Sequence, residues 1–75
     1  MTVLARPLLS IQQRRIMSLV SAGRTNREIG VLMVLSEDTV KCHLREVFRK
    51  LEARDRAHAV RRCFECGIFR VGGDR

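Results

Sequence analysis

Two helix starts lie close together in the stretch Thr25-Asn-Arg-Glu-Ile-Gly-Val-Leu-Met-Val-Leu-Ser-Glu-Asp-Thr-Val-Lys-Cys-His-Leu44. The first start, Thr25-Asn-Arg-Glu28, has the pattern of a capping box, in which the Thr hydroxyl and the Glu side chain satisfy backbone N–H groups. The second is Ser36, followed by two acidic residues that the helix dipole favours in a first turn. A short helix, a tight turn and a longer helix form a helix-turn-helix. The stretch therefore predicts helices over 26–34 and 37–51.

Two further helices flank this pair. Ser10-Ile-Gln-Gln13 is another capping box and starts a helix over 10–22. A fourth helix over 56–66 ends at Gly67. Apolar residues repeat with helical spacing throughout, and no run alternates as a strand would. The expected fold is all-α, a single four-helix domain over 1–75 with a loose tail at 70–75. The expected inward-facing residues are Ile16, Leu19 and Val20; Ile29, Leu32 and Met33; Val40, Leu44, Val47, Phe48 and Leu51; and Ala59, Val60 and Cys63.

The length of 75 residues suffices for one small domain. There is no run of about 18 apolar residues for a membrane span, and the N-terminus lacks the apolar section of a signal peptide. Neither a paired acid/base constellation nor a phosphate loop is present. The sequence therefore predicts a cytoplasmic protein that is not an enzyme, uses no cofactor and does not act at a membrane.

The charge points to an anionic partner. Fifteen Lys and Arg residues against eight Asp and Glu residues give a formal net charge of +7. Such an excess in a small domain favours nucleic acid first and an acidic membrane surface second. The stretch 41–62, which includes most of the longer helix of the pair, carries much of this excess.

The three cysteines are Cys42, Cys63 and Cys66, an odd number that argues against a disulfide framework. Cys63 and Cys66 have C-x-x-C spacing, but one such pair supplies only two of the four ligands of a structural zinc. His43 and His58 could be offered as the others, although nothing fixes their spacing. We interpret Cys63 and Cys66 as small apolar residues of a helix, with no metal, and keep a zinc or redox role as the minor alternative.

The outer side of the helix over 37–51 carries the candidate DNA contacts. An α-helix enters the major groove, and Arg or Lys can bond guanine O6 and N7. Recognition helices use their N-terminal part for bases, which assigns Lys41, Cys42 and Arg45 to base edges. Further contacts are expected to phosphates, from Arg49 and Lys50 later in the helix and from Thr25, Asn26 and Thr39 at helix starts.

These residues resemble the LuxR/GerE-type (NarL/FixJ-type) DNA-binding domain, in its stand-alone, GerE-like form. The resemblance implies four helices, binding to double-stranded promoter DNA as a homodimer (formed in solution or only on DNA), and transcriptional regulation, with RNA polymerase as a further partner. It also places dimer contacts on the last helix, here at Ala57, Cys63 and Phe64; Phe64 could equally complete the monomer core. The matching stretches are Leu9-Ser-Ile-Gln-Gln-Arg-Arg-Ile-Met-Ser-Leu-Val20, Gly23-Arg-Thr-Asn-Arg-Glu-Ile29, Leu35-Ser-Glu-Asp-Thr-Val-Lys-Cys-His-Leu44, Lys50-Leu51, Arg54-Asp-Arg56 and Ala59-Val60.

Four positions depart from the family pattern. Gly30 stands where alanine is common, and we expect it to allow a close crossing of the next helix. Gln12-Gln13 replaces the usual Arg-Glu, with the capping box retained. Glu52 stands where a glycine usually closes the recognition helix, which leaves room for that helix to continue by a few residues.

Two other functions remain open from the residues. A module like region 4 of a sigma factor would share the helix-turn-helix and would bind promoter DNA poorly without RNA polymerase. A phage-type interaction module would bind a protein of the transcription machinery without reading DNA, and its affinity would be insensitive to salt.

Overall fold

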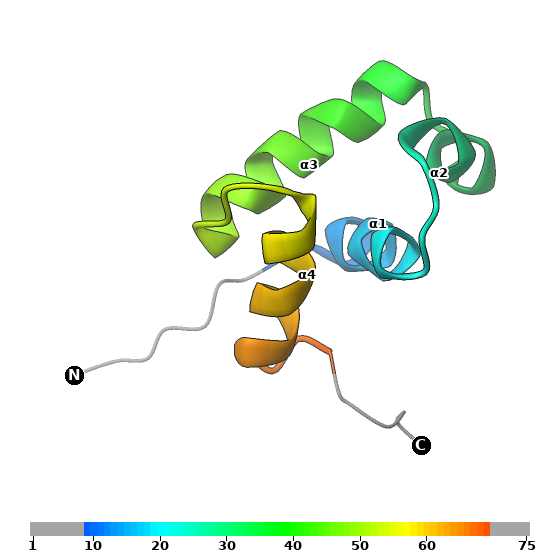
Figure 1. Ribbon diagram of the computed structural model, residues 1–75. Coiled ribbons are helices and arrows are strands. Elements are labelled where there is room, and N and C mark those ends of the chain that lie inside the picture. Colours follow the sequence, from blue (N-terminus) through cyan, green and yellow to red (C-terminus); the bar gives the residue numbers. More distant parts are fainter. Residues whose placement is uncertain (1–8, 70–75) are drawn as a thin grey trace.

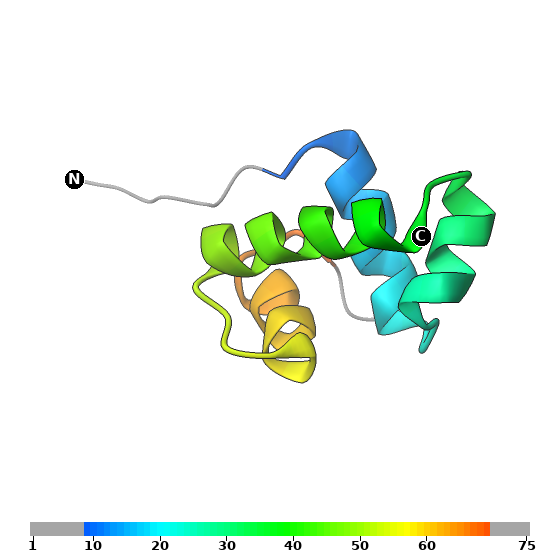
Figure 2. The same cartoon turned by 90° about the horizontal axis from the view of Figure 1, so that it is seen from above.

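The computed structural model describes residues 9–69, which form four helices and no strand. These are α1 (Ile11–Ser21), α2 (Asn26–Met33), α3 (Glu37–Leu51) and α4 (Arg56–Glu65) (Figure 1). Each end lies within one residue of the range expected from the sequence. The tail 70–75 lies outside the described residues. α3 is the longest helix and packs against the other three, and Figure 2 shows it crossing the molecule.

The helix starts carry the caps that the sequence predicts. Both capping boxes are complete, at Ser10 with Gln13 and at Thr25 with Glu28. The Ser36 hydroxyl accepts a hydrogen bond from the backbone N–H of Thr39 at 3.1 Å and so caps α3. These side chains satisfy N–H groups that have no partner within the helix.

Two helices end on non-glycine residues in the left-handed region. Val34 follows α2 with φ 58°, and Glu52 follows α3 with φ 54°. The expectation that Glu52 would let α3 run on is wrong, because Glu52 itself takes this conformation and α3 ends at Leu51. Its N–H bonds the Arg49 carbonyl at 3.1 Å, which closes the last turn.

Gly30 makes room for the turn between α2 and α3. A Cβ atom at this position would lie 2.6 Å from the carbonyl oxygen of Leu35. The Leu35 N–H also bonds the Gly30 carbonyl at 2.8 Å. The segment that lies closest to Gly30 is therefore the backbone of the turn. The prediction that α3 itself makes this close approach is wrong.

The core lies between α3 and the inner sides of the other helices. The prediction that Leu32 faces inward is wrong, because Leu32 is 55% exposed. Met17, which is not among the residues predicted to face inward, is wholly buried. Leu19, Met33, Phe48 and Val60 are partly buried at the edge of the core. The buried apolar residues are Leu9, Ile16, Met17, Val20, Ile29, Val40, Leu44, Val47, Leu51, Ala59 and Cys63.

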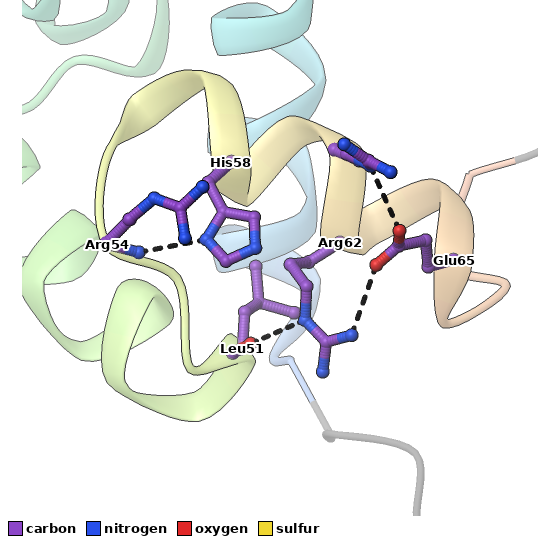
Figure 3. Close-up of polar contacts among 6 residues, drawn as sticks. Leu51, Arg54, His58, Arg62 and Glu65 are labelled. Carbon is purple, nitrogen blue, oxygen red and sulfur yellow. Dashed lines mark hydrogen bonds and ion pairs between the residues drawn. The ribbon is translucent and has the colours of Figure 1, made fainter.

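A polar network joins α4 to the end of α3. Arg62 donates from Nε to the carbonyl oxygen of Leu51 at 2.9 Å and from Nη1 to Glu65 at 3.1 Å (Figure 3). A cation is favourable there because the last carbonyls of a helix carry partial negative charge. At the start of α4, Nδ1 of His58 accepts a hydrogen bond from the Arg54 N–H at 3.1 Å (Figure 3).

Candidate nucleic-acid interface

A row of basic residues runs along the outer side of α3. Lys41, Arg45 and Arg49 follow one another at intervals of four residues, about one helical turn, and all three are exposed. Cys42, which is also exposed, lies next to the row. Arg49 is 3.7 Å from the Glu46 carboxylate, and both side chains are largely exposed. The row is well placed for direct contact with an anionic partner, because the apolar side of α3 is taken up by the core.

Lys50 points in a different direction from Arg49. Its ammonium group donates to Oε1 of Gln13 on α1 at 3.1 Å and lies 3.9 Å from the Glu46 carboxylate. Its side chain is only 27% exposed. Consecutive residues of a helix differ by about 100° in direction, so Lys50 lies on the α1 side of α3. Lys50 therefore lies beside the last residue of the basic row, Arg49, with which it shares the Glu46 carboxylate, but its ammonium group is directed toward α1.

Thr39 lies on the same side of α3 as Lys50, since eleven residues are about three helical turns. Its side chain is half-buried, and Oγ1 accepts a hydrogen bond from the Ser36 hydroxyl at 2.8 Å. Thr39 and Ser36 thus bond each other at the start of the helix. Because its side chain lies on the Lys50 side of α3, Thr39 is not part of the row formed by Lys41, Arg45 and Arg49.

A hollow of about 300 Å³ lies beside the basic row. The N-terminal parts of α2 and α4 form its other walls. Lys41, Arg45 and Arg56 give the hollow three cationic side chains. Arg56 is not among the DNA contacts that the sequence predicts. The residues that line the hollow are Asn26, Lys41, Leu44, Arg45, Phe48 and Arg56.

The two candidates at the start of α2 are held in different ways. Thr25 is exposed, and its hydroxyl oxygen accepts from the Glu28 N–H at 3.1 Å. This capping bond uses an oxygen lone pair and not the hydroxyl hydrogen. Asn26 is half-buried, and its Oδ1 accepts a hydrogen bond from Arg56 at 2.7 Å.

The residues expected at a dimer contact divide between surface and core. Ala57 is exposed, and Phe64 is 40% exposed with its ring packed edge-on against Phe69 at 5.4 Å between centroids. Cys63 is wholly buried, so placing its side chain at a partner surface is wrong. Burial, together with the neighbouring thiol of Cys66, raises the pKa of Cys63 to about 11. The Cys63 thiol is therefore protonated and lies inside the monomer.

Among residues 9–69, no three His, Cys, Asp or Glu side chains come together as a metal site would require. Within the same range, no helix has the length and apolar character needed to cross a membrane.

Comparison with known proteins identifies the family. Residues 7–63 match the family described as bacterial regulatory proteins, luxR family. The chain is 43% identical over 51 residues to YhjB of Escherichia coli (strain K12), an alignment that covers 68% of this chain and 26% of YhjB. It is 37% identical over 62 residues to the transcriptional activator protein CarR of Pectobacterium carotovorum subsp. carotovorum, covering 83% of this chain and 25% of CarR.

A third relative is the HTH-type quorum sensing-dependent transcriptional regulator RpaR of Rhodopseudomonas palustris, which is 36% identical over 66 residues. That alignment covers 88% of this chain and 27% of RpaR. The chain spans about a quarter of the length of these three relatives. Its helix-turn-helix, with both expected caps, lies within the matched residues. The chain belongs to the luxR family of bacterial regulatory proteins.

Proposed function

We propose that this chain is a sequence-specific DNA-binding domain that regulates transcription by placing α3 in the major groove of promoter DNA. The observation that carries the proposal is the exposed row of Lys41, Arg45 and Arg49 on a helix whose other side is buried. Side chains of this kind bond guanine edges near the start of a recognition helix and phosphates further along it. The net charge of +7 adds attraction to the phosphate backbone.

In this proposal Lys41, Cys42 and Arg45 contact base edges, and Arg49 contacts a phosphate. The Thr25 hydroxyl and the amide of Asn26 contact a second phosphate from the start of α2. Cys42 is small and weakly polar, so its contact is with a thymine methyl group. Lys50 bonds Gln13 on α1, and Thr39 bonds the cap residue Ser36. In this proposal both side chains hold α3 in position and make little contact with DNA.

The proposed DNA-bound form is a two-fold dimer in the bacterial cytoplasm. Ala57 and Phe64 on the outer side of α4 form the proposed contact between the two copies, which assemble in solution or only on DNA. Two-fold symmetry predicts two half-sites about 10 bp apart from centre to centre. The relatives CarR and RpaR are named as a transcriptional activator and a transcriptional regulator, which supports a role at promoters. Contact with RNA polymerase is a further part of the proposal.

Selection from a random duplex pool tests the proposal. The unmodified protein should select a motif with two related halves, and Arg45→Ala should relax the preference at one base pair of each half. The expected loss is about 1–3 kcal/mol of discrimination, the range for one bidentate contact. Arg15→Ala is the matched control, because Arg15 is an exposed arginine on α1 that lines a hollow beside Ile68 and Phe69.

The outcome against the proposal is an unmodified protein that selects no motif at two salt concentrations. Co-purification of one stoichiometric protein with salt-insensitive affinity would then favour the interaction module. A motif selected only when RNA polymerase is present would favour a module like region 4 of a sigma factor.

A further inference from the structure

Arg56 links two helices that do not pack against each other. Among the described residues, the backbones of α2 and α4 each approach α1 and α3 but do not approach each other. Arg56 is the first residue of α4. Its side chain crosses this gap and donates from Nη1 to Oδ1 of Asn26 at 2.7 Å and from Nη2 to the Arg24 carbonyl at 2.7 Å.

These two bonds hold both residues that flank the cap of α2. Arg24 precedes Thr25 and Asn26 follows it, so the guanidinium fixes the chain on each side of the proposed phosphate contact. Both bonds are short, as is typical of hydrogen bonds from an ionised donor. The planar fork of a guanidinium sets two donor directions at once, which a lysine ammonium does not do.

The same side chain lies next to the proposed base-reading residues. Arg56 lines the hollow of about 300 Å³ together with Lys41 and Arg45. The guanidinium that bonds the start of α2 therefore lines the same hollow as two residues of the basic row. Phosphate contacts set the register of a protein on a duplex, and base contacts depend on that register. An error in the position of α2 relative to α3 would weaken both kinds of contact.

We infer that Arg56 is a positioning residue for DNA recognition, which acts through Asn26 and the Arg24 carbonyl to hold the start of α2 in register with Lys41 and Arg45. The inference rests on the proposed function. Arg56 itself reads no base, and its contribution depends on the geometry of its two bonds more than on its charge.

The test compares Arg56→Met and Arg56→Lys with the unmodified protein on the selected duplex and on random duplex. Both variants should bind the selected duplex about tenfold more weakly, since each loses the paired bonds from a charged donor. Binding to random duplex should change much less. Arg61→Met is the control, because Arg61 is a largely exposed arginine on the same helix whose partner is Glu65. Circular dichroism and measurements well below each unfolding temperature ensure that folded protein is compared.

A double-mutant cycle with Asn26→Ala separates positioning from direct contact. If Arg56 acts in part through Asn26, the loss of affinity in the variant with both Arg56→Met and Asn26→Ala should be smaller than the sum of the two single losses, with the bond to the Arg24 carbonyl accounting for the part that stays additive. Strictly additive losses would overturn the inference, and so would Arg56→Lys binding as tightly as the unmodified protein, because charge alone would then suffice. Failure of the unmodified protein to select any motif would instead overturn the proposed function.

Discussion

The ammonium group of Lys50 on α3 donates a hydrogen bond to Oε1 of Gln13 on α1 at 3.1 Å, and the same oxygen accepts from the Ser10 N–H at 3.1 Å. Gln13 is only 4% exposed. One amide oxygen therefore completes the cap of α1 and also ties α1 to α3. The group on α1 that Lys50 bonds is a neutral amide, and the first turn of α1 contains no acidic residue.

Gln13→Glu should stabilise the fold. A carboxylate at this position would pair with the Lys50 ammonium and place a negative charge at the N-terminus of α1, for a gain of about 1 kcal/mol. For a domain of this size that corresponds to a rise of about 4–8 °C in unfolding temperature. Thermal unfolding at neutral pH measures it. The gain should be smaller in a Lys50→Met background, where only the interaction with the helix dipole remains; an equal gain there would show that Lys50 is not involved.

Val34→Gly should also stabilise the fold, for a different reason. Val34 is β-branched, has φ 58° and is 88% exposed, so it carries the steric cost of the left-handed region without burying its side chain. Glycine removes a strain of about 1–2 kcal/mol, partly offset by its greater freedom in the unfolded chain.

The matched control is Val31→Gly, at a position inside α2 that is 74% exposed. There glycine should cost about 0.3–0.5 kcal/mol, because it is a poorer helix former than valine. Chemical denaturation of both variants should give shifts of opposite sign. A loss of stability in both would contradict the strain assigned to Val34.

The helices could be predicted from the sequence because their signals are local. The capping boxes at Ser10 and Thr25 and the cap at Ser36 each involve residues three apart in the chain, and the structure retains all of them. The last residue of α3, Leu51, matches the predicted range, but the way in which the helix closes could not be predicted, since Glu52 takes a conformation that glycine adopts more readily. Leu32 was assigned to the core by spacing alone, but an eight-residue helix offers its neighbours only a narrow side.

The candidate site could be predicted in part. The row on α3 follows from helical spacing, so Lys41, Arg45 and Arg49 are exposed as the sequence indicates. The directions of Lys50 and Arg56 could not be predicted, because their partners Gln13 and Asn26 lie 37 and 30 residues away in the chain. No periodic pattern identifies such pairs. They become visible only when the helices are packed.

The three thiols should differ widely in reactivity. Cys42 is exposed, Cys66 is half-buried, and Cys63 is wholly buried with a pKa raised to about 11. Since the thiolate is the reactive form, Ellman's reagent at pH 8 should modify Cys42 first and Cys63 only as fast as the fold opens. Cys42→Ser should remove the fast phase. Fast modification of Cys63 in folded protein would contradict its burial.

Glu65 should make stability depend on pH in the acid range. Hydrogen bonds from Arg62 and, to a lesser extent, from Arg61 hold the pKa of this carboxyl below its usual value of 4.5. The folded state thus binds the proton less readily than the unfolded chain, so the ionised group stabilises the fold above that value and the effect is lost as the pH falls. Denaturation of wild type and Glu65→Gln should therefore differ at neutral pH and converge in acid. A difference that is constant over this range would contradict the assignment.

Arg49 and Lys50 are neighbours in the chain but should differ in their effect on DNA binding. Arg49 is exposed at the end of the basic row, whereas Lys50 is directed toward Gln13. If Arg49 contacts a phosphate, Arg49→Gln should lower the slope of log affinity against log salt by about 1, because one fewer counterion is released. Lys50→Gln should leave that slope nearly unchanged and lower the unfolding temperature instead. Fluorescence anisotropy over a series of salt concentrations measures the slopes. Equal slope changes for the two variants would mean that Lys50 leaves Gln13 to meet the DNA, in which case the α1–α3 link would not persist in the complex.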